Sequence, residues 1–187
     1  GLAADMRERG VPARVVTLLQ SPSLTYTDPM QRLDSGLNKG IRMCVLGGAA
    51  GTGKTVTACR VMYDLRRGRY IKAVTYAGLQ QNDDWRRQIY QTAPVLVIDD
   101  LGMDPDHLAW RMNELLSVRY DGPGHWFTLI TTNLDKSELE RRYSKPIMQR
   151  IVERGGHLIC TEVLRRSMKD QVEADRQREL PVEGDER

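Results

Sequence analysis

The chain has 187 residues, 40% of them hydrophobic and 28% charged, and its 28 Lys and Arg against 25 Asp and Glu give a formal net charge of +3. This length predicts one compact domain with extensions, and the apolar fraction excludes a chain that is disordered for lack of hydrophobic residues. No apolar run approaches the roughly 18–20 residues of a membrane span, so we expect no membrane contact. The first ten residues also lack the apolar stretch of a signal peptide.

Residues 1–40 predict a mixed N-terminal extension, because Pro12, Pro22 and Pro29 interrupt any long element. One short helix is expected from Asp28 to about Leu37, with Asp28 as its cap and Pro29 in its first turn. The last segment, residues 165–187, is rich in both charges and predicts a solvated helix or a disordered tail.

Between these segments, residues 41–164 predict a single α/β domain. Apolar runs indicate five short strands, at 41–46, 71–76, 95–98, 126–131 and 158–160. Helical spacing occupies the segments between them, including a stripe from Ala58 to Leu65 and another from Leu108 to Arg119 that Asp104 and Pro105 would cap. Short strands with little alternation, separated by helices, are typical of a parallel sheet that is covered on both faces.

The three cysteines, Cys44, Cys59 and Cys160, show no CxxC or Cys/His spacing. An odd number without such spacing argues against a disulfide framework or a zinc site and favours a reducing, cytoplasmic compartment. Each cysteine lies among apolar residues, so we expect buried thiols.

One segment carries a specific phosphate-binding signature. It matches GxxxxGK[ST], follows a predicted strand and opens a predicted helix, and it consists of Gly48, Ala49, Ala50, Gly51, Thr52, Gly53, Lys54 and Thr55. Backbone N–H groups of this loop and the helix N-terminus would surround the phosphates of ATP. Lys54 would reach the β- and γ-phosphates, and Thr55 would ligate Mg²⁺. The alternative is a glycine-rich turn between strand and helix.

Two carboxylates end the most apolar predicted strand. Asp99 and Asp100 follow Val95–Ile98, and ligands of parallel sheets bind at the carboxyl ends of the strands. Asp99 would hold Mg²⁺, usually through water, and Asp100 would orient the attacking water. Alone, the sequence Asp-Asp-Leu-Gly would be no more than a strand-ending turn, but the phosphate loop before it favours a site.

Together with the phosphate loop, the segment 99–102 makes the chain resemble the DnaC/IstB-type AAA+ ATPases, a family of replicative-helicase loaders and transposition helpers. Arg119-Tyr120 and the later segment 128–134, TLITTNL, are similar to the family's "RY … TIITSNL" passage, and 147–151 resembles its "LxxRI" helix. The resemblance covers about residues 40–166. It implies a P-loop NTPase fold of AAA+ type with a parallel five-stranded sheet and no full helical lid.

The resemblance also implies roles for single residues. Asn133 takes the sensor-1 position, where a polar side chain at a strand end helps to place the water. The alternative for Asn133 is a turn residue just before a capping box formed by Asp135 and Glu138. Arg165 or Arg166 could be the sensor-2 arginine, although a solvated basic pair is the favoured reading.

Arg150 takes the position of the arginine finger, which completes the site of a neighbouring subunit. A helical wheel supports this independently, because it places Arg150 with Gln149 and Glu153, opposite an apolar face that includes Ile147 and Ile151. A solvated surface arginine is the alternative.

The chain departs from the family's pattern in some respects. Helicase-binding members carry a separate N-terminal domain, whereas only 47 residues precede Gly48 here. Asp100 stands where most AAA+ proteins have Glu, and its shorter reach would slow hydrolysis.

Two basic segments raise the question of nucleic acid. Residues Arg60, Arg66, Arg67, Arg69 and Lys72 cluster around the end of the helix after the loop, where they would attract phosphates or, as we favour, stabilise a helix C-terminus. Trp85 lies beside Arg86 and Arg87, but Trp85 and Ile89 are one helical turn apart, so we expect Trp85 in the core.

The resemblance implies an ATP-binding and hydrolysing protein that assembles with nucleotide and assists a DNA replication or transposition machine. Its partners would be further copies of the chain, DNA and a replication or transposition protein, for example a replicative helicase. One alternative is a weakly hydrolysing, ATP-dependent binding switch. A small P-loop kinase is less favoured, because we find no arginine-bearing lid segment.

Overall fold

The structure of the chain is a computed structural model that describes residues 1–22, 24 and 26–159, except for the side chains of Gln81 and of residues 152–159. The predictions for Cys160, Arg165, Arg166, the tail and the missing lid therefore lie outside the described residues. Among the described residues, no helix is long and apolar enough to cross a membrane.

Five strands form one parallel sheet in the order β2-β3-β4-β1-β5. The strands are β1 Met43–Gly47, β2 Arg69–Lys72, β3 Val95–Leu101, β4 Phe127–Thr132 and β5 Gly155–Ile159. All five predicted strands are present, but the prediction for 71–76 is half wrong, because the chain turns into helix α5, Ala73–Ala77, after Lys72. Ala73, Tyr76 and Ala77 are buried at i, i+3 and i+4, which is the spacing of one helical face.

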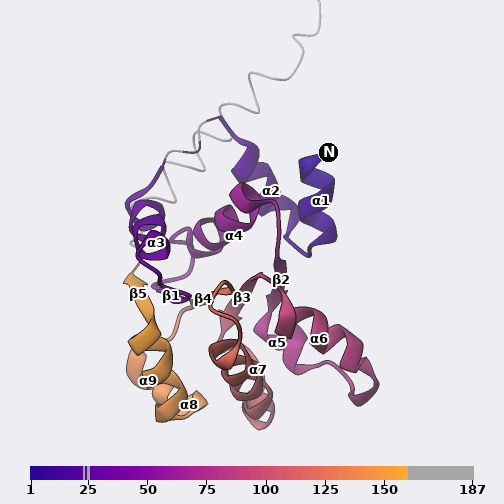
Figure 1. The fold of residues 1–187 in the computed structure, drawn as a ribbon, viewed down its shortest axis with the longest axis vertical. Helices are drawn as coiled ribbons and strands as arrows, with labels where there is room; N and C mark the ends of the chain where they lie inside the picture. Colours follow the sequence, from indigo (N-terminus) through magenta and orange to yellow (C-terminus); the bar gives the residue numbers. More distant parts are fainter. Residues whose placement is uncertain (23, 25, 160–187) are drawn as a thin grey trace, which may run out of the picture.

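Helices cover both faces of the sheet, as Figure 1 shows. On one face lie α1 Leu2–Glu8, α2 Ala13–Gln20, α3 Asp28–Asn38 and α4 Lys54–Leu65; on the other lie α5, α6 Asp84–Thr92, α7 Ala109–Asp121, α8 Lys136–Tyr143 and α9 Lys145–Arg154. Strand β1 divides its side chains between the two layers, since Cys44 and Leu46 face α4 while Met43 and Val45 face the α7 side. The prediction of a doubly covered parallel sheet is confirmed.

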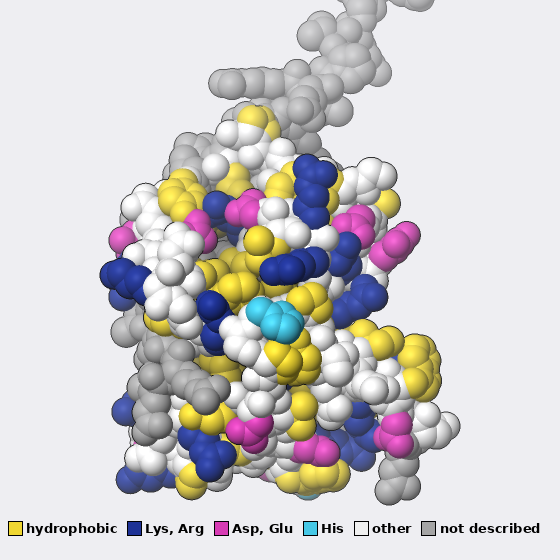
Figure 2. Space-filling view, in the orientation of Figure 1, with side chains coloured by type: hydrophobic (Ala, Val, Ile, Leu, Met, Phe, Trp, Pro, Cys, Tyr) yellow, Lys and Arg dark blue, Asp and Glu magenta, His cyan; other side chains and the backbone are white. Residues whose placement is uncertain are grey.

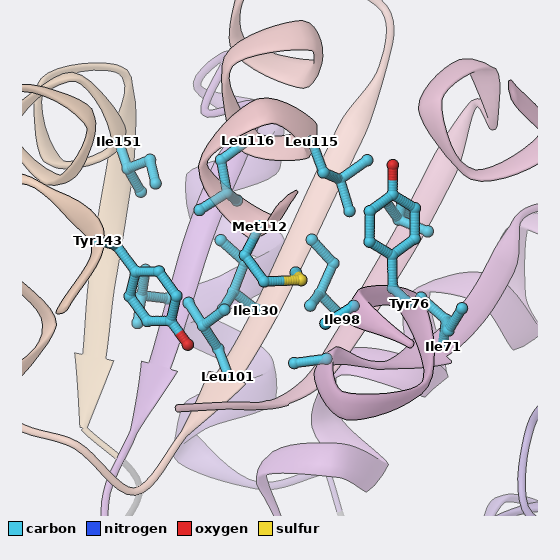
Figure 3. Packing of buried hydrophobic residues seen from close by; sticks show 14 of the residues in the cluster. Ile71, Tyr76, Ile98, Leu101, Met112, Leu115, Leu116, Ile130, Tyr143 and Ile151 are labelled. Atoms are coloured by element: carbon cyan, nitrogen blue, oxygen red, sulfur yellow. The ribbon is translucent and has the colours of Figure 1, made fainter. Parts of the chain in front are cut away.

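The core on the α7 side is built around the inner face of that helix. Met112, Leu115 and Leu116 pack against Ile98 and Ile130 of the central strands, as Figure 3 shows. All five side chains are fully buried, and burying a side chain of this size stabilises the fold by about 1.5–3 kcal/mol. This packing fixes α7, and with it the loop that joins α7 to the end of β3.

The N-terminal segment packs into the opposite core. Met6 of α1 and Val16 of α2 are fully buried in the cluster that also holds Cys59 of α4. The prediction of buried thiols is confirmed for Cys44 and Cys59. At the edge of the sheet, the N–H of Tyr70 in β2 donates to the carbonyl of Arg9 at 2.9 Å.

Two predicted helix caps differ in the structure. Helix α3 has the predicted extent, but Thr27 is its N-cap residue and Asp28 already lies in the first turn. Asp104 does not cap α7. It is buried and accepts hydrogen bonds from the Tyr143 hydroxyl and the Gly102 N–H, so it ties the loop after β3 to α8.

The expectation that Trp85 lies in the core is wrong. Trp85 is 64% exposed, and α6 contains no fully buried residue. Figure 2 shows hydrophobic side chains at the surface over this part of the molecule. The stripe of Trp85 and Ile89 has helical spacing, but the stripe faces outward because α6 covers the sheet only at its edge.

Candidate nucleotide-binding site

The phosphate-binding signature forms the loop between β1 and α4. Gly51 and Gly53 have φ angles of +90° and +83°, which favour glycine, and Gly53 is the N-cap residue of α4. No heavy atom lies within 4 Å of a Cβ built on Gly53, so the backbone angle rather than the space requires glycine there. The loop therefore delivers the N-terminus of a 12-residue helix to the carboxyl edge of the sheet.

Lys54 is held inside this loop. Its Nζ donates to the carbonyl oxygens of Gly48 and Ala49 at 2.7 and 2.6 Å, and the residue is only 6% exposed. The loop thus curls around a positively charged ammonium group. A curled loop with a positive charge inside it suits the binding of an anion.

Asp99 at the end of β3 is a buried carboxylate that hydroxyl groups surround. Thr55 Oγ1 donates to its Oδ1 at 2.7 Å, Thr131 Oγ1 donates to the same oxygen at 2.6 Å, and Tyr70 Oη donates to Oδ2 at 2.6 Å. Asp99 is 3% exposed. The structure therefore brings the predicted metal ligands Thr55 and Asp99 into direct contact.

Thr131 and Tyr70 are functional candidates that sequence reasoning missed. The Thr131 hydroxyl accepts from the Asp100 N–H at 2.9 Å, so its own proton is directed at Asp99. Tyr70 stands opposite Val97 in the β2–β3 register, two residues before Asp99. Thr131 ends a predicted strand and Tyr70 directly precedes one, but the partner of each hydroxyl depends on strand order and register, which the sequence alone does not give.

Asp100 leaves the regular strand. Its φ is +56°, and the β3–β4 register shifts between Ile98 and Leu101. The Asp100 carboxylate lies 4.0 Å from Nζ of Lys72 and is partly exposed. Burial and the neighbouring Asp99 charge raise the pKa of Asp100 above its usual value, against the opposing charges of Lys72 and Lys54.

The site supplies the oxygen ligands that Mg²⁺ prefers, a carboxylate and a hydroxyl. The Asp99 charge meets only hydroxyl dipoles at its three hydrogen-bonded contacts, so a cation beside it would be stabilised. Among the described residues no group of three or more His, Cys, Asp or Glu side chains suits a metal ion. A metal here would therefore complete its shell with phosphate and water oxygens.

Asn133 follows β4 directly, at the same edge of the sheet. Thr132, the residue before it, pairs with Leu101 of β3 and with Gly47 of β1, so Asn133 emerges between the acidic pair and the phosphate loop. Asn133 is exposed. The capping box of Asp135 and Glu138 that was expected just beyond it is present at the start of α8.

Arg150 is not brought to this site. It lies on the exposed side of α9 while Ile151 is buried, as the helical wheel predicts, and its guanidinium lies 5.6 Å from the ring centroid of Tyr120. Tyr120 is in the last turn of α7, and α9 leads into the first residue of β5, so both lie toward the amino edge of the sheet. At about 3.3 Å per strand residue, the two edges are roughly 16 Å apart.

The basic residues around the end of α4 do not form one patch of free cations. Arg60 pairs with Asp34 and Asp64 at 3.5 and 2.9 Å and stacks on Tyr26, and Lys72 faces Asp100. Figure 2 shows Lys and Arg side chains over α1, α2 and β2 on the side drawn there. Stabilisation of the helix C-terminus by these residues stays a prediction, and attraction of nucleic acid stays its alternative.

Comparisons with known proteins agree with the fold. A family model described as RNA helicase matches residues 44–120, which run from β1 into the last turn of α7. No curated protein sequence matches this chain. The chain is similar in structure to the DnaC helicase loader, with a TM-score of 0.53 at 19% identity over 71% of this chain and 86% of that one.

Two further solved structures are similar. DnaI has a TM-score of 0.60 at 18% identity, covering 83% of this chain and 97% of that one. AMPPCP-bound DnaA from Aquifex aeolicus has a TM-score of 0.58 at 15% identity, covering 82% of this chain and 51% of that one. At these identities the likeness shows the fold alone, which is a parallel α/β sheet that helices cover on both faces.

Proposed function

We propose that this chain is a Mg²⁺-dependent ATPase of AAA+ type that assembles with nucleotide and assists a DNA replication or transposition machine. The observation that carries the proposal is the 2.7 Å contact between Thr55 and Asp99. It joins the first turn of α4 to the end of β3 directly beside the phosphate loop, which supports a single site for phosphate and metal.

In this proposal the loop N–H groups and Lys54 bind the phosphates of ATP. Lys54 exchanges the carbonyls of Gly48 and Ala49 for phosphate oxygens. Thr55 and Asp99 hold Mg²⁺, which when bound neutralises part of the phosphate charge. Asp100 orients the attacking water, and its raised pKa makes it a stronger base than an ordinary Asp. Asn133 fixes the position of that water.

A second copy of the chain supplies one more positive charge to the site, the guanidinium group of its Arg150. Arg150 lies against Tyr120 at the end of α7, toward the amino edge of the sheet, and a head-to-tail contact between two copies would bring different surfaces of the chain together. The isolated chain would then turn over slowly. This favours a weakly hydrolysing binding switch as the second candidate, for conditions in which assembly does not occur.

The proposed partners rest on the similar structures. One of them is a helicase loader, and another is a replication initiator bound to AMPPCP and single-stranded DNA. We therefore propose DNA and a replication or transposition protein as the partners of this chain.

The first test replaces the loop lysine. Lys54→Ala removes the ammonium group that donates to the carbonyls of Gly48 and Ala49, so we expect a folded protein whose binding of a fluorescent ATP analogue falls about 100-fold. The matched control is Lys136→Ala, a mainly exposed lysine on α8. Unchanged nucleotide affinity and turnover in folded Lys54→Ala would remove the basis of the proposal.

A further inference from the structure

A buried carboxylate closes the loop that follows the acidic pair. Asp104 is 3% exposed, and its Oδ1 accepts a hydrogen bond from the Gly102 N–H at 3.2 Å. Gly102 has a φ of +106°, and a Cβ added there would lie 2.5 Å from a methyl carbon of Leu134. In the same loop the Met103 N–H donates to the Asp100 carbonyl at 3.0 Å, as in a β-turn. Asp104 therefore fixes a tight turn that begins at Asp100 itself.

The backbone conformation of Asp100 depends on this turn. Its φ of +56° is uncommon for residues other than glycine, and such a conformation persists only where surrounding contacts hold it. The Asp100 N–H donates to Thr131 Oγ1, and its carbonyl accepts from Met103. The first contact comes from β4, within the sheet, whereas the second comes from the turn that Asp104 closes.

The end of α8 supplies the other contacts of Asp104. The Tyr143 hydroxyl donates to the same Oδ1, and Arg142 donates to the Asp104 backbone carbonyl and lies 3.6 Å from Oδ2. The Arg142 Nε also donates to the Tyr143 hydroxyl at 3.0 Å. Tyr143 is fully buried in the core cluster that holds Leu101 and Met112, as Figure 3 shows. Asp104 thus joins the turn to a well-packed part of the core.

We propose that Asp104 is a positioning residue of the proposed ATPase, which holds Asp100 in the conformation that orients the attacking water. This inference rests on the proposed function. The phosphate and metal ligands lie elsewhere, because Lys54 and Thr55 are on α4 and Asp99 keeps its register with β2. A misplacement of about 1 Å can slow a reaction about 100-fold. Loss of Asp104 should therefore slow hydrolysis and spare the binding of Mg-ATP.

The test replaces Asp104 by alanine and by asparagine. Asp104→Ala removes both oxygens, whereas Asp104→Asn keeps one oxygen that can accept from Gly102 and Tyr143. Asp106→Ala is the matched control, because Asp106 pairs with the same Arg142 but is exposed and lies outside the turn that begins at Asp100. Affinity for a fluorescent ATP analogue with Mg²⁺ and single-turnover phosphate release are measured for each variant, and urea unfolding checks the fold.

We expect Asp104→Ala to keep its affinity within about threefold and to release phosphate about 10- to 100-fold more slowly. Asp104→Asn should recover most of that loss, and Asp106→Ala should behave as the original chain. In an Asp100→Asn background, Asp104→Ala should slow the residual turnover no further, because Asp104 acts through Asp100.

Tyr143→Phe provides a second variant should Asp104→Ala fail to fold. It keeps the ring in the core and removes one donor to the Asp104 carboxylate. We expect a smaller loss of turnover, about 2- to 10-fold, again with affinity for the analogue unchanged.

Normal turnover in folded Asp104→Ala, or in Tyr143→Phe if the first variant does not fold, would overturn the inference and leave the proposed function standing. A loss of affinity as large as the loss of turnover would also overturn it, as would an equal slowing by Asp104→Ala in the Asp100→Asn background. If the original chain binds the analogue but hydrolyses no ATP at any protein concentration, the proposed function fails and the inference falls with it.

Discussion

Two side chains of opposite charge are buried at opposite edges of the sheet, and each is only 3% exposed. Asp99 at the carboxyl edge is held by three side-chain hydroxyls. Arg119 at the amino edge donates to Thr128 Oγ1 and to the backbone carbonyls of Gln91, Ala93 and Phe127, and its guanidinium stacks over Trp126 at 4.6 Å.

The two sites differ in whether the hydrogen-bond partners of the buried charge can reorient. Backbone carbonyls cannot turn away, so Arg119 fastens the end of α6 and the start of β4 to α7 and keeps its donors there. Burial lowers the pKa of Arg119 to about 10, which still leaves it charged at neutral pH. Hydroxyl groups rotate, so the partners of Asp99 can share it with a cation. The buried charge of Arg119 therefore stabilises the fold, whereas the buried charge of Asp99 is available to bind a cation.

The largest expected effect concerns a second arginine near the amino edge. If Arg150 completes a neighbour's site, Arg150→Ala should bind ATP almost normally and turn over slowly, by as much as roughly 10³–10⁵-fold, because arginines supplied from a partner can contribute that much. Phosphate release is measured against protein concentration, with Arg141→Ala on α8 as the control.

Mixing the two inactive proteins separates action within a subunit from action between subunits. Arg150→Ala mixed with Lys54→Ala should regain activity, since mixed interfaces pair an intact loop with an intact arginine. A concentration-independent ATPase, with no rescue when the variants co-assemble, would mean that Arg150 does not act on a neighbour.

The next effect separates the two acids at the carboxyl edge. Asp100→Asn should keep Mg-ATP binding and lose hydrolysis by about 10²–10⁴-fold, because it removes the base and leaves the metal ligands in place. Asp99→Asn should instead weaken the contribution of Mg²⁺ to ATP binding. Normal hydrolysis by Asp100→Asn, measured as single-turnover phosphate release, would refute this division of roles.

Replacing the two buried charged residues should change the free energy of unfolding by different amounts. Arg119→Met leaves four neutral acceptors without their donor, and at about 1–3 kcal/mol for each buried group left unsatisfied the free energy of unfolding should fall by several kcal/mol. Asp99→Asn should change it by no more than about 1 kcal/mol, because rotating hydroxyls can donate or accept. Urea unfolding of both variants checks this, and equal losses would remove the contrast between the edges.

The smallest effect follows from the raised pKa of Asp100. A carboxyl group whose pKa is raised in the folded chain binds its proton more tightly there than in the unfolded chain. It therefore stabilises the fold at pH values below its unfolded pKa. This contribution is lost as the pH rises through its folded pKa, where the carboxylate becomes charged. Asp100→Asn should therefore raise the melting temperature slightly at pH 7 and not at pH 3. Asp121→Asn, at the other edge, is the control, and a lower melting temperature for Asp100→Asn at pH 7 would contradict the shift.

Local patterns in the sequence were sufficient for the phosphate loop, for helices α3, α4 and α7 and for the presence of five strands, because each is encoded by a few consecutive residues. They did not predict α1 and α2. They failed at α5 and Trp85, where helical spacing is short or faces outward. Two of the three hydroxyls around Asp99, those of Tyr70 and Thr131, come from residues 29 and 32 positions away, so only strand order and register bring them to Asp99. The Arg119 contacts were missed for the same reason.

The hydrogen bond between the Tyr70 N–H and the Arg9 carbonyl also covers part of one edge of the sheet. β2 is an edge strand, and an uncovered edge strand has unpaired N–H groups that can bond to a strand of another molecule. Here a carbonyl from the turn after α1 occupies one such group, and α1 and α2 lie over the neighbouring apolar surface. A shortened chain that began at residue 41 would lose this cover, so we expect it to aggregate through β2 even if its phosphate loop remained intact.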